Sequence, residues 1–484
     1  MEYISMCGHN VIYCGESCIL GSDLKLWNLS RDGIREALKR GDITVCVVGL
    51  GGVGLAIATV WLRHGARVIG VDIDKNKVNL LNKGTVPHPE EIVRATISSN
   101  VANGRFTATT DLIKATKMSD IVNVIVPLVY HDYCPDFSAL DDVFTKVSQS
   151  LDVGHTVILE TSVPPGTTEY RVRRILENSS GLLAGKDFAL IYSPERVMIG
   201  HAVEDIERRY PKIISGIGKK SIDIAVALYS NICEAGVIVV SSPRVAEFAK
   251  LAEGIYRDVN IALANELARL ARVIGVDFSE VRKAANSQPY CHLHKPGAGV
   301  GGLCIPIYPM LMEWTAELNR VRLELVLTAR IINKQQPLYL TSLLLEGLST
   351  ANIKIDSSVK VAVLGLAFRG DVPSAAKSPT YDLVRSLKEL GLTVVVHDPL
   401  ISDDMKLREL GVKLSSNLSE VLHGCTAAVV STDHSQYREL STFDILEASG
   451  STKIIIVDGR DILKLQECGG RVLYTSTSKP WIWL

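Results

Sequence analysis

Hydrophobic positions along the chain follow two patterns, which alternate from Asp42 onward. Short runs rich in Val and Ile predict buried strands, and the longer stretches between them carry apolar residues at helical spacing. In the first half of the chain, strands are expected at residues 43–48, 67–71, 121–126, 156–159, 189–191 and 236–240. Strands that alternate with helices in this way predict a parallel sheet with helices on both faces.

The middle of the chain has only the helical pattern. Apolar side chains recur every three or four residues through residues 244–273, and a second helical stretch is expected at about 310–333. These long apolar helices predict a connection between two α/β units that also provides the contact of a homodimer.

After Pro337 the alternating pattern returns, and strands are expected at residues 359–364, 393–396, 427–430 and 453–457. The sequence therefore predicts the α/β class, with two doubly wound, Rossmann-like parallel-sheet domains joined by a helical middle domain. The expected parts are an N-terminal extension at 1–41, a first sheet domain at 42–242, a helical domain at 243–337 and a second sheet domain at 338–484.

Length and composition narrow the class of protein. A chain of 484 residues exceeds what one hydrophobic core usually organises. Its 52 basic and 53 acidic residues give a formal net charge of −1, which argues against a broad nucleic-acid-binding surface. No run approaches the roughly 20 apolar residues of a membrane span, and no secretory signal is visible. Ten scattered cysteines suit a reducing compartment, so we expect a cytoplasmic protein without nucleic-acid or membrane partners.

Four potential metal ligands cluster near the start, namely Cys7, His9, Cys14 and Cys18. Their spacing matches no common closed zinc site. We therefore expect an N-terminal extension that carries free thiols, and no metal centre.

A glycine-rich turn follows the first expected strand, with the sequence Gly49-Leu-Gly51-Gly-Val-Gly54. Gly49 permits the turn, Gly51 lets the backbone approach a pyrophosphate, and Gly54 lets the helix pack on the strand. Asp72 ends the next strand, where a carboxylate can bind both ribose hydroxyls and repel a 2′-phosphate. This context favours NAD over NADP, and the alternative is a ligand-free glycine turn with a surface aspartate.

One cysteine ends a second glycine-rich segment, Gly297-Ala-Gly299-Val-Gly301-Gly302-Leu-Cys304. A thiol becomes a good nucleophile when nearby cations or N–H groups stabilise its thiolate. An isolated cysteine is more often inert and buried, but the glycines have no use in ordinary core packing. Cys304 is therefore a candidate nucleophile.

Further candidates lie on the long helix and after two strands. Glu247, Lys250, Gly254 and Asp258 are spaced to share one helix face, and Lys250 lies in an apolar stretch. A buried lysine can accept a proton or stabilise an oxyanion, although most helical lysines are solvated. Glu195 follows an expected strand, where it could activate water or, alternatively, be only a carboxylate at a helix N-terminus.

These motifs together resemble the UDP-glucose/GDP-mannose dehydrogenase family over about residues 34–461. The matching segments are the glycine turn, Val163-Pro-Pro-Gly, Ser193-Pro-Glu195-Arg, Glu247-x-x-Lys250, Asn265-Glu266, Gly301-Gly-x-Cys304, Gly365-Leu-Ala-Phe, Ser378-Pro379 and Asp458-Gly-Arg460. Two further segments, Tyr256-Arg-Asp-Val-Asn-Ile-Ala and Pro194-Glu-Arg-Val, look most like the branch that acts on UDP-N-acetylhexosamines, especially UDP-N-acetyl-mannosamine.

The resemblance implies a four-electron oxidation of the sugar C6 alcohol to a carboxylate with NAD, through a thiohemiacetal and a thioester. It implies that 42–242 binds NAD and that 338–484 holds the UDP part of the substrate. In this reading Cys304 is the nucleophile, Lys250 the catalytic lysine and Glu195 the acid that assists hydrolysis. The implied cofactor-binding residues are Gly49, Gly51, Val53, Gly54, Asp72, Pro127 and Ser162, and the implied substrate-binding residues are Arg257, Gly301 and Arg369.

Several positions depart from the family pattern. Gly254 stands where the family has an asparagine that stabilises the oxyanion, and Leu303 replaces a histidine. Ala376 replaces an arginine associated with the substrate, and Gly52 and Ala56 replace a tyrosine and a proline of the cofactor turn. We expect the missing donor at Gly254 to lower kcat and Gly254→Asn to raise it. UDP-glucose oxidation, an inactive nucleotide-binding homologue and a hydroxy-acid dehydrogenase remain alternatives.

Overall fold

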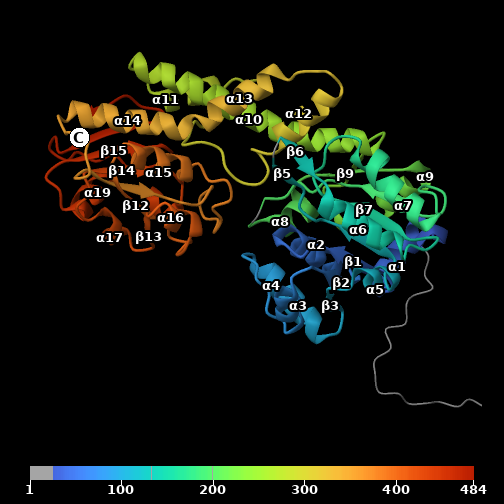
Figure 1. Ribbon diagram of the computed structural model, residues 1–484. Coiled ribbons are helices and arrows are strands. Elements are labelled where there is room, and N and C mark those ends of the chain that lie inside the picture. The colour runs from blue at the N-terminus through green and yellow to red at the C-terminus, as the bar shows by residue number, and fades with distance from the viewer. Residues whose placement is uncertain (1–25, 132, 199) are drawn as a thin grey trace, which may run out of the picture.

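The computed structural model describes residues 26–131, 133–198 and 200–484. The chain forms two sheet domains joined by long helices, and α10 (Pro243–Val273) runs along one side of both (Figure 1). The cluster at Cys7, His9, Cys14 and Cys18 lies outside the described residues. Both sheet domains have the doubly wound α/β architecture that the hydrophobic pattern predicted.

The first sheet has eight strands in the order β10-β9-β8-β7-β4-β1-β2-β3. They are β1 Thr44–Val48, β2 Arg67–Val71, β3 Phe106–Thr109, β4 Ile121–Val124, β7 Thr156–Leu159, β8 Ala189–Tyr192, β9 Lys212–Gly216 and β10 Val237–Val239. Every neighbouring pair is parallel, as predicted, except β8 and β9, which are antiparallel. A small antiparallel hairpin, β5 Val129–His131 and β6 Cys134–Asp136, stands apart from the sheet.

Helices cover both faces of this sheet. They are α1 Arg31–Arg40, α2 Gly52–Arg63, α3 Lys75–Asn82, α4 Glu91–Ala102, α5 Leu112–Lys117, α6 Ser138–Ser148, α7 Arg173–Ser180, α8 Ala202–Glu204 and α9 Gly218–Ile232. Short helical turns lie at Leu26–Asn28, Thr167–Val172 and Asp205–Arg209. Side chains alternate along β1, so that Val45 and Val47 join one core while Cys46 and Val48 join the other.

Residues 26–41 belong to the first domain rather than to an extension. Ser30 caps α1 by accepting a hydrogen bond from Gly33 N. Leu26, Ile34 and Leu38 are buried in the core, and α1 packs on α9.

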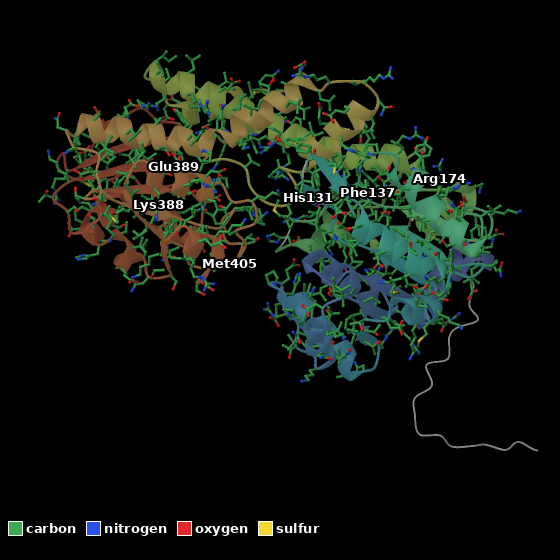
Figure 2. All side chains as sticks on the ribbon, viewed as in Figure 1. His131, Phe137, Arg174, Lys388, Glu389 and Met405 are labelled. Carbon is green, nitrogen blue, oxygen red and sulfur yellow. The ribbon has the colours of Figure 1, made fainter. Side chains whose placement is uncertain are left out.

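The middle of the chain is helical, as predicted. Ser242 caps α10 through its side chain, and Pro243 stands in the first turn, where a missing N–H costs nothing. α11 Phe278–Ala285, α12 Tyr308–Leu318 and α13 Glu324–Lys334 follow. The helical stretch expected at 310–333 is two helices, because the chain leaves the helix after Leu318 and passes through positive φ at Arg320. Phe137, labelled in Figure 2, contacts Trp314 of α12 and ties α6 to this region.

The second sheet has seven strands in the order β13-β12-β11-β14-β15-β16-β17. They are β11 Lys360–Leu364, β12 Thr393–His397, β13 Lys413–Ser415, β14 Ala427–Val430, β15 Ile454–Asp458, β16 Val472–Ser476 and β17 Ile482–Trp483. Only β16 and β17 pair in antiparallel fashion. The flanking helices are α14 Gln336–Thr350, α15 Thr380–Glu389, α16 Met405–Glu409, α17 Leu418–Leu422, α18 Ser435–Arg438 and α19 Thr442–Ser449.

The predicted boundary at residue 337 falls in the first turn of α14. This helix packs on α15 and β15, and its Leu340, Leu343 and Leu344 lie in the core of the second sheet domain. By its packing, α14 belongs to that domain.

Candidate active site

The glycine turn after β1 is fixed by two close backbone contacts. Gly49 has φ +97°, and a β-carbon there would lie 2.5 Å from Ile125 O. A β-carbon at Gly54 would lie 1.8 Å from Gly49 O, so neither position tolerates a side chain. By contrast, a β-carbon at Gly51 would meet nothing within 4 Å. The turn therefore leaves open space beside Gly51.

This space adjoins the start of α2. Gly51 is the N-cap of the helix and provides no side-chain hydrogen bond, and Val53 lies in the first turn. The backbone N–H groups there are available to an external acceptor, and the helix dipole favours an anion. These features fit the pyrophosphate of a dinucleotide.

Asp72 follows β2 beside this turn. Its carboxylate accepts hydrogen bonds from Leu50 N at 3.0 Å, Asp74 N at 3.0 Å and Lys77 Nζ at 2.8 Å. Partial burial opposes ionisation, but the hydrogen bonds outweigh it and lower the pKa of Asp72. An ionised carboxylate at this position can accept hydrogen bonds from ribose hydroxyls and would repel a 2′-phosphate.

Two neighbouring strand ends complete this edge of the sheet. Pro127 follows β4, and Thr161 and Ser162 follow β7. Thr161 Oγ1 donates to Val126 O at 2.8 Å and joins the two segments. Ser162 Oγ donates to Tyr308 Oη at 3.0 Å, which links this edge to the segment that carries Cys304.

A cavity of about 1100 Å³ lies between the first sheet domain, α10 and the second sheet domain. Cys304, Arg257, Gly301 and Arg369 all line it. Its charged lining side chains are Arg196, Asp205, Arg209, Glu253, Arg257, Lys295, Arg369 and Arg460. The excess of cations among these residues favours an anionic ligand such as a diphosphate.

The segment that carries Cys304 depends on close packing. β-Carbons at Gly301 and Gly302 would lie 2.8 and 2.9 Å from atoms of Phe368, and Gly302 has φ +90°. Gly302 N donates to Ala376 O at 2.9 Å, so the glycines let this segment lie directly against the second sheet domain. Cys304 itself is exposed at the cavity, where a substrate could reach the thiol.

The predicted face of α10 is buried. Glu247, Lys250, Gly254 and Asp258 all point inward. Glu247 accepts hydrogen bonds from Gly166 N at 2.5 Å and Thr168 N at 2.8 Å, so its contacts hold the preceding turn. Asp258 pairs with Arg330 of α13 at 2.5 Å.

Lys250 is 8% exposed and is not among the residues that line the cavity. Burial lowers the pKa of Lys250, and the nearby Cys304 and Glu195 oppose that effect only in part. A lysine of this kind releases its proton more readily than a solvated one, which suits it to accept a proton from a bound alcohol.

Glu195 lies in a buried ion-pair cluster and not among the lining residues of the cavity. It follows β8 in an irregular segment, so the alternative of a carboxylate at a helix N-terminus is wrong. Lys212 Nζ lies 2.5 Å from Glu195 Oε2 and 2.9 Å from Glu160 Oε2, and Tyr229 Oη donates to Glu160 at 2.6 Å. Burial opposes ionisation of Glu195, but Lys212 outweighs it and lowers the pKa of Glu195. Burial raises the pKa of Glu160 to about 7.

Comparison with known proteins agrees with this arrangement. Residues 43–233, 244–335 and 362–465 match, in turn, the NAD binding domain, the central domain and the UDP binding domain of the UDP-glucose/GDP-mannose dehydrogenase family. The chain belongs to this family. It is therefore an NAD-dependent nucleotide-sugar dehydrogenase, and the glycine turn lies in its NAD binding domain.

Individual relatives cover nearly the whole chain. A UDP-N-acetyl-D-mannosamine dehydrogenase of Pyrococcus horikoshii is 34% identical over 420 residues, which are 87% of this chain and 96% of the relative. The structure of a UDP-D-ManNAc dehydrogenase from Pyrococcus horikoshii has a TM-score of 0.82 at 32% identity, over 90% of this chain and 99% of that one. The structure of an NDP-N-acetyl-D-galactosaminuronic acid dehydrogenase from Methanosarcina mazei has a TM-score of 0.78 at 31% identity, over 93% and 98%.

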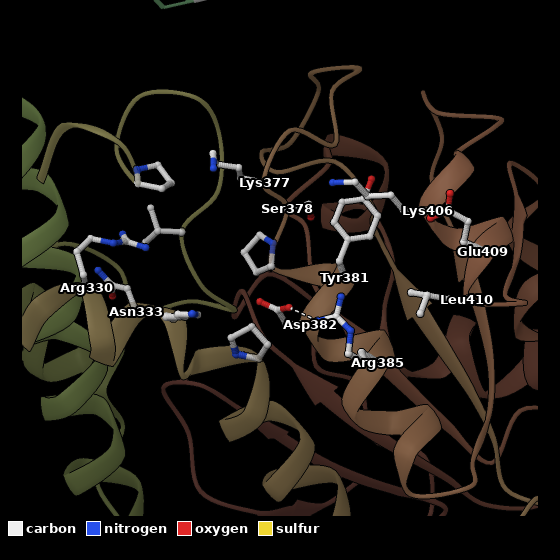
Figure 3. Close-up of a pocket in the computed structure, with 15 residues that line it drawn as sticks. Arg330, Asn333, Lys377, Ser378, Tyr381, Asp382, Arg385, Lys406, Glu409 and Leu410 are labelled. Atoms are coloured by element: carbon white, nitrogen blue, oxygen red, sulfur yellow. Dashed lines mark hydrogen bonds and ion pairs between the residues drawn. The ribbon is translucent and has the colours of Figure 1, made fainter. Parts of the chain in front are cut away.

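A second pocket of about 590 Å³ lies between α13 and α15 (Figure 3). Its lining includes Arg330 and Lys377, and an ion pair joins Asp382 and Arg385 at 2.8 Å. None of the predicted catalytic residues lines it. Within the described part of the chain, no helix is long and apolar enough to cross a membrane.

Sequence reasoning missed two features of this site. One is the Glu160–Lys212 pair, for which the only signal was a glutamate at the end of an expected strand. The other is Tyr308, whose ring occupies the space beside Gly254. A β-carbon at position 254 would lie 2.3 Å from Tyr308 Cδ2. Gly254 therefore leaves no gap, and this crowding argues against the expectation that Gly254→Asn by itself raises kcat.

Proposed function

We propose that the chain oxidises the C6 alcohol of a UDP-N-acetylhexosamine, UDP-N-acetyl-mannosamine in particular, to the carboxylate in two steps at Cys304. The observation that carries this proposal is the position of the thiol. Cys304 is exposed at a cation-rich cavity that lies between the NAD binding and UDP binding domains, with the buried Lys250 behind it.

The cations of the cavity suit the diphosphate of the substrate. We assign Arg257 and Arg369, on α10 and on the loop after β11, to substrate binding, together with the backbone at Gly301. Arg196 pairs with Glu253 at 2.7 Å, and Arg209 pairs with Asp205 at 3.2 Å, so part of the positive charge is already balanced. A diphosphate could accept charge-assisted hydrogen bonds from cations of this lining.

The cofactor is assigned to the edge of the first sheet. The open space at Gly51 and the first turn of α2, with Val53, would hold the pyrophosphate, and Asp72 would hold the adenine ribose. Pro127 and Ser162, at the neighbouring strand ends, would line the nicotinamide side. NAD supplies the electron acceptor for each of the two oxidations when it is bound.

The side chains around Cys304 account for the remaining chemistry. Lys250, whose pKa is lowered by burial, accepts the proton of the C6 hydroxyl as the alcohol becomes an aldehyde. The Cys304 sulfur then bonds to the aldehyde carbon and forms a thiohemiacetal. The thiohemiacetal carbon then gives up a hydride and its hydroxyl loses a proton, which leaves a thioester. Water breaks the C–S bond of the thioester and releases the carboxylate and the thiol. Glu195, held ionised by Lys212, is assigned to assist this hydrolysis, although it is buried and does not line the cavity.

The names of the relatives support this substrate class. Two of the similar proteins named above act on N-acetylated sugars by their names, at 31–34% identity. UDP-glucose is the second candidate, because the family description includes it.

A panel of UDP-sugars, each mixed with NAD and assayed for reduced cofactor and carboxylate, tests the proposal. We expect UDP-N-acetyl-mannosamine to give the highest kcat/KM. Cys304→Ser and Cys304→Ala should lose carboxylate formation by about 10³-fold or more while NAD binding persists. Cys291→Ser is the matched control, because Cys291 is half-buried and does not line the cavity. Carboxylate formation at the parental rate in Cys304→Ala would overturn the proposal, as would a parent chain that oxidises no sugar.

We further propose a homodimer through the central helices. Leu263, Leu267 and Leu270 of α10 and Ile274 at its C-cap follow one another at helical spacing and are 37–64% exposed. An apolar stripe of this length on a long helix is typical of a subunit contact. Leu270→Glu should shift the chain from dimer to monomer in sedimentation velocity, and a monomeric parent would contradict the proposal.

A further inference from the structure

Tyr308 is attached to the same turn of chain as the thiol. It begins α12, four residues after Cys304, and both Ile307 N and Tyr308 N donate to Cys304 O at 3.0 Å. The side chain is 8% exposed. The backbone therefore holds Tyr308 and Cys304 on one turn.

The ring fits only because position 254 is glycine. Any β-carbon there would lie 2.3 Å from Tyr308 Cδ2, far inside van der Waals contact. Gly254 lies one helical turn beyond Lys250 on the same buried face of α10. Lys250 Nζ lies 5.4 Å from the centroid of the Tyr308 ring. Gly254 and Tyr308 thus form a matched pair directly beside the catalytic lysine and thiol.

The hydroxyl of Tyr308 lies between two groups of the site. Ser162 Oγ donates to Tyr308 Oη at 3.0 Å, which leaves the phenolic hydrogen free to be donated elsewhere. Its other neighbour is the thiol of Cys304, on the same turn of backbone and close enough to raise the pKa of Tyr308. Burial first, and then Cys304, raise the pKa of Tyr308 well above its ordinary value. The phenol therefore stays protonated and remains a donor at neutral pH.

We propose that Tyr308 is a catalytic residue whose hydroxyl donates a hydrogen bond to the Cys304 sulfur and then to the oxygen of the adduct formed there. In this proposal the Tyr308 hydroxyl stabilises the oxyanion, which is the function that the family resemblance assigns to an asparagine at position 254. The proposal rests on the proposed function for its second half. When the sulfur bonds to the aldehyde carbon, the carbonyl electron pair moves to the oxygen. Tyr308 stabilises that charge by a hydrogen bond and neither gains nor loses a proton.

Tyr308→Phe separates the hydroxyl from the ring, because the ring still fills the space beside Gly254. Loss of one oxyanion donor typically lowers kcat by about 10²–10³-fold, and we expect a loss of that order. The KM for the UDP-sugar and the affinity for NAD should change less than about threefold, since the hydroxyl acts on the reacting atoms. Tyr339→Phe is the matched control, because its hydroxyl accepts a hydrogen bond from Arg272 near the other end of α10.

A second readout does not require turnover. Iodoacetamide alkylates a thiolate, so the rate at Cys304, followed by peptide mass in the protein without substrate, reports how well that thiolate is stabilised. In Tyr308→Phe alkylation at a fixed neutral pH should be slower than in the parent, and in Tyr339→Phe it should not change. An unchanged alkylation rate together with an unchanged kcat in Tyr308→Phe would overturn the proposal.

A swap of the pair provides a test of geometry. Gly254→Asn alone should lose activity, because the ring leaves no room for the new side chain. Combined with Tyr308→Ala, the same asparagine should gain space and supply an amide donor, so the double variant should exceed Tyr308→Ala by about tenfold or more in kcat. Additive losses in the double variant would show that Tyr308 only fills space. Failure of the proposed function is distinguishable, since it would leave the parent without carboxylate product but would not alter the alkylation result.

Discussion

The two sheet domains begin with the same local design. Gly49 and Gly365 follow the first strand of each sheet, with φ of +97° and +103°. Each glycine donates its N–H to the end of the second strand, Gly49 N to Val71 O at 2.8 Å and Gly365 N to His397 O at 2.7 Å. An aspartate follows that second strand in both domains. If only the glycine turn and the carboxylate are considered, both sheet domains are expected to bind the same kind of ligand.

Their carboxylates are used differently. Asp398 is fully buried and accepts hydrogen bonds from Leu366 N and Ala367 N, both at 2.8 Å, and from Leu400 N and Ile401 N. Its Oδ2 also lies 3.2 Å from His434 Nε2. Asp72 is partly exposed and accepts from Leu50 N, Asp74 N and Lys77 only. Asp398 therefore has little remaining capacity to accept hydrogen bonds from a ligand, whereas Asp72 can still accept them.

The helices also start at different distances from the glycine. α2 begins at Gly52, directly after the turn, and presents its N–H groups there. α15 begins only at Thr380, after a long loop. That loop packs against Gly301 and Gly302, and its Phe368 and Arg369 line the cavity. Two features therefore distinguish the dinucleotide site from a similar turn that shapes a cavity wall. The carboxylate of the dinucleotide site can still accept hydrogen bonds, and its helix begins directly after the glycine turn.

The largest effect is expected from Asp398→Ala. This change removes the acceptor of four backbone N–H groups in a fully buried position, so the free energy of unfolding of the second domain should fall by about 3–5 kcal/mol. Urea denaturation measures it. Asp403→Ala, which removes only an exposed pair with Arg408, should stay within about 0.5 kcal/mol of the parent. Equal urea midpoints for Asp398→Ala and Asp403→Ala would contradict the structural role assigned to Asp398.

A smaller effect is expected from Asp72→Ala, and mainly on binding. Loss of charge-assisted hydrogen bonds to the ribose should weaken NAD binding by about 1.5–3 kcal/mol, or roughly 10–150-fold. NADP binding should weaken less, because the repulsion of a 2′-phosphate is relieved. Titration of both cofactors measures the change. If the parent bound NADP as tightly as NAD, the assignment of Asp72 to the ribose would be contradicted.

The contribution of Asp398 to stability should depend on pH in the acid range. Burial opposes ionisation of Asp398, but hydrogen bonds from His434 and the backbone outweigh it and lower the pKa of Asp398. Its stabilisation is therefore complete above the ordinary aspartate value of about 4 and is lost as the pH falls through the lower, folded-state pKa. Asp398→Asn should lack this part of the acid sensitivity, as seen in urea midpoints between pH 2 and 6. An unchanged acid profile would mean that other carboxylates account for it.

The smallest effect is expected from Lys77→Ala. The side chain of Lys77 is partly exposed, so its pair with Asp72 contributes less than about 1 kcal/mol to the free energy of unfolding. NAD affinity should fall by less than about tenfold, since Asp72 keeps its two backbone hydrogen bonds. Denaturation and titration of this variant beside Asp72→Ala measure how much of the site depends on the pair. A loss as large as that in Asp72→Ala would show that Lys77 is the principal ligand contact.

Much of the fold was predictable because buried strands in parallel sheets have continuous apolar runs. The bounds of β2, β7 and β14 agree with the sequence pattern to the residue. β3 was missed because its sequence, Phe-Thr-Ala-Thr, alternates weakly. β9 was missed because it begins with Lys212, which looks exposed in sequence but is buried and paired with Glu160 and Glu195.

The site divides in the same way. Glycine spacing and the buried face of α10 are local properties, and the sequence predicted both. The contact between Gly254 and Tyr308 joins residues on different helices. The cluster of Glu160, Glu195 and Lys212 likewise joins residues that follow or begin different strands. A sequence shows that a side chain is missing at 254, but only the packed structure shows what fills its place.

The central claim is that both oxidations of one sugar take place at Cys304, where the two unlike halves meet. The most direct test counts reduced cofactor against sugar product in a single-turnover reaction with NAD and UDP-N-acetyl-mannosamine. The account predicts two reduced cofactors per carboxylate in the parent, and no more than one, with aldehyde as the product, in Cys304→Ala. One reduced cofactor per sugar in the parent, or two in Cys304→Ala, would contradict it.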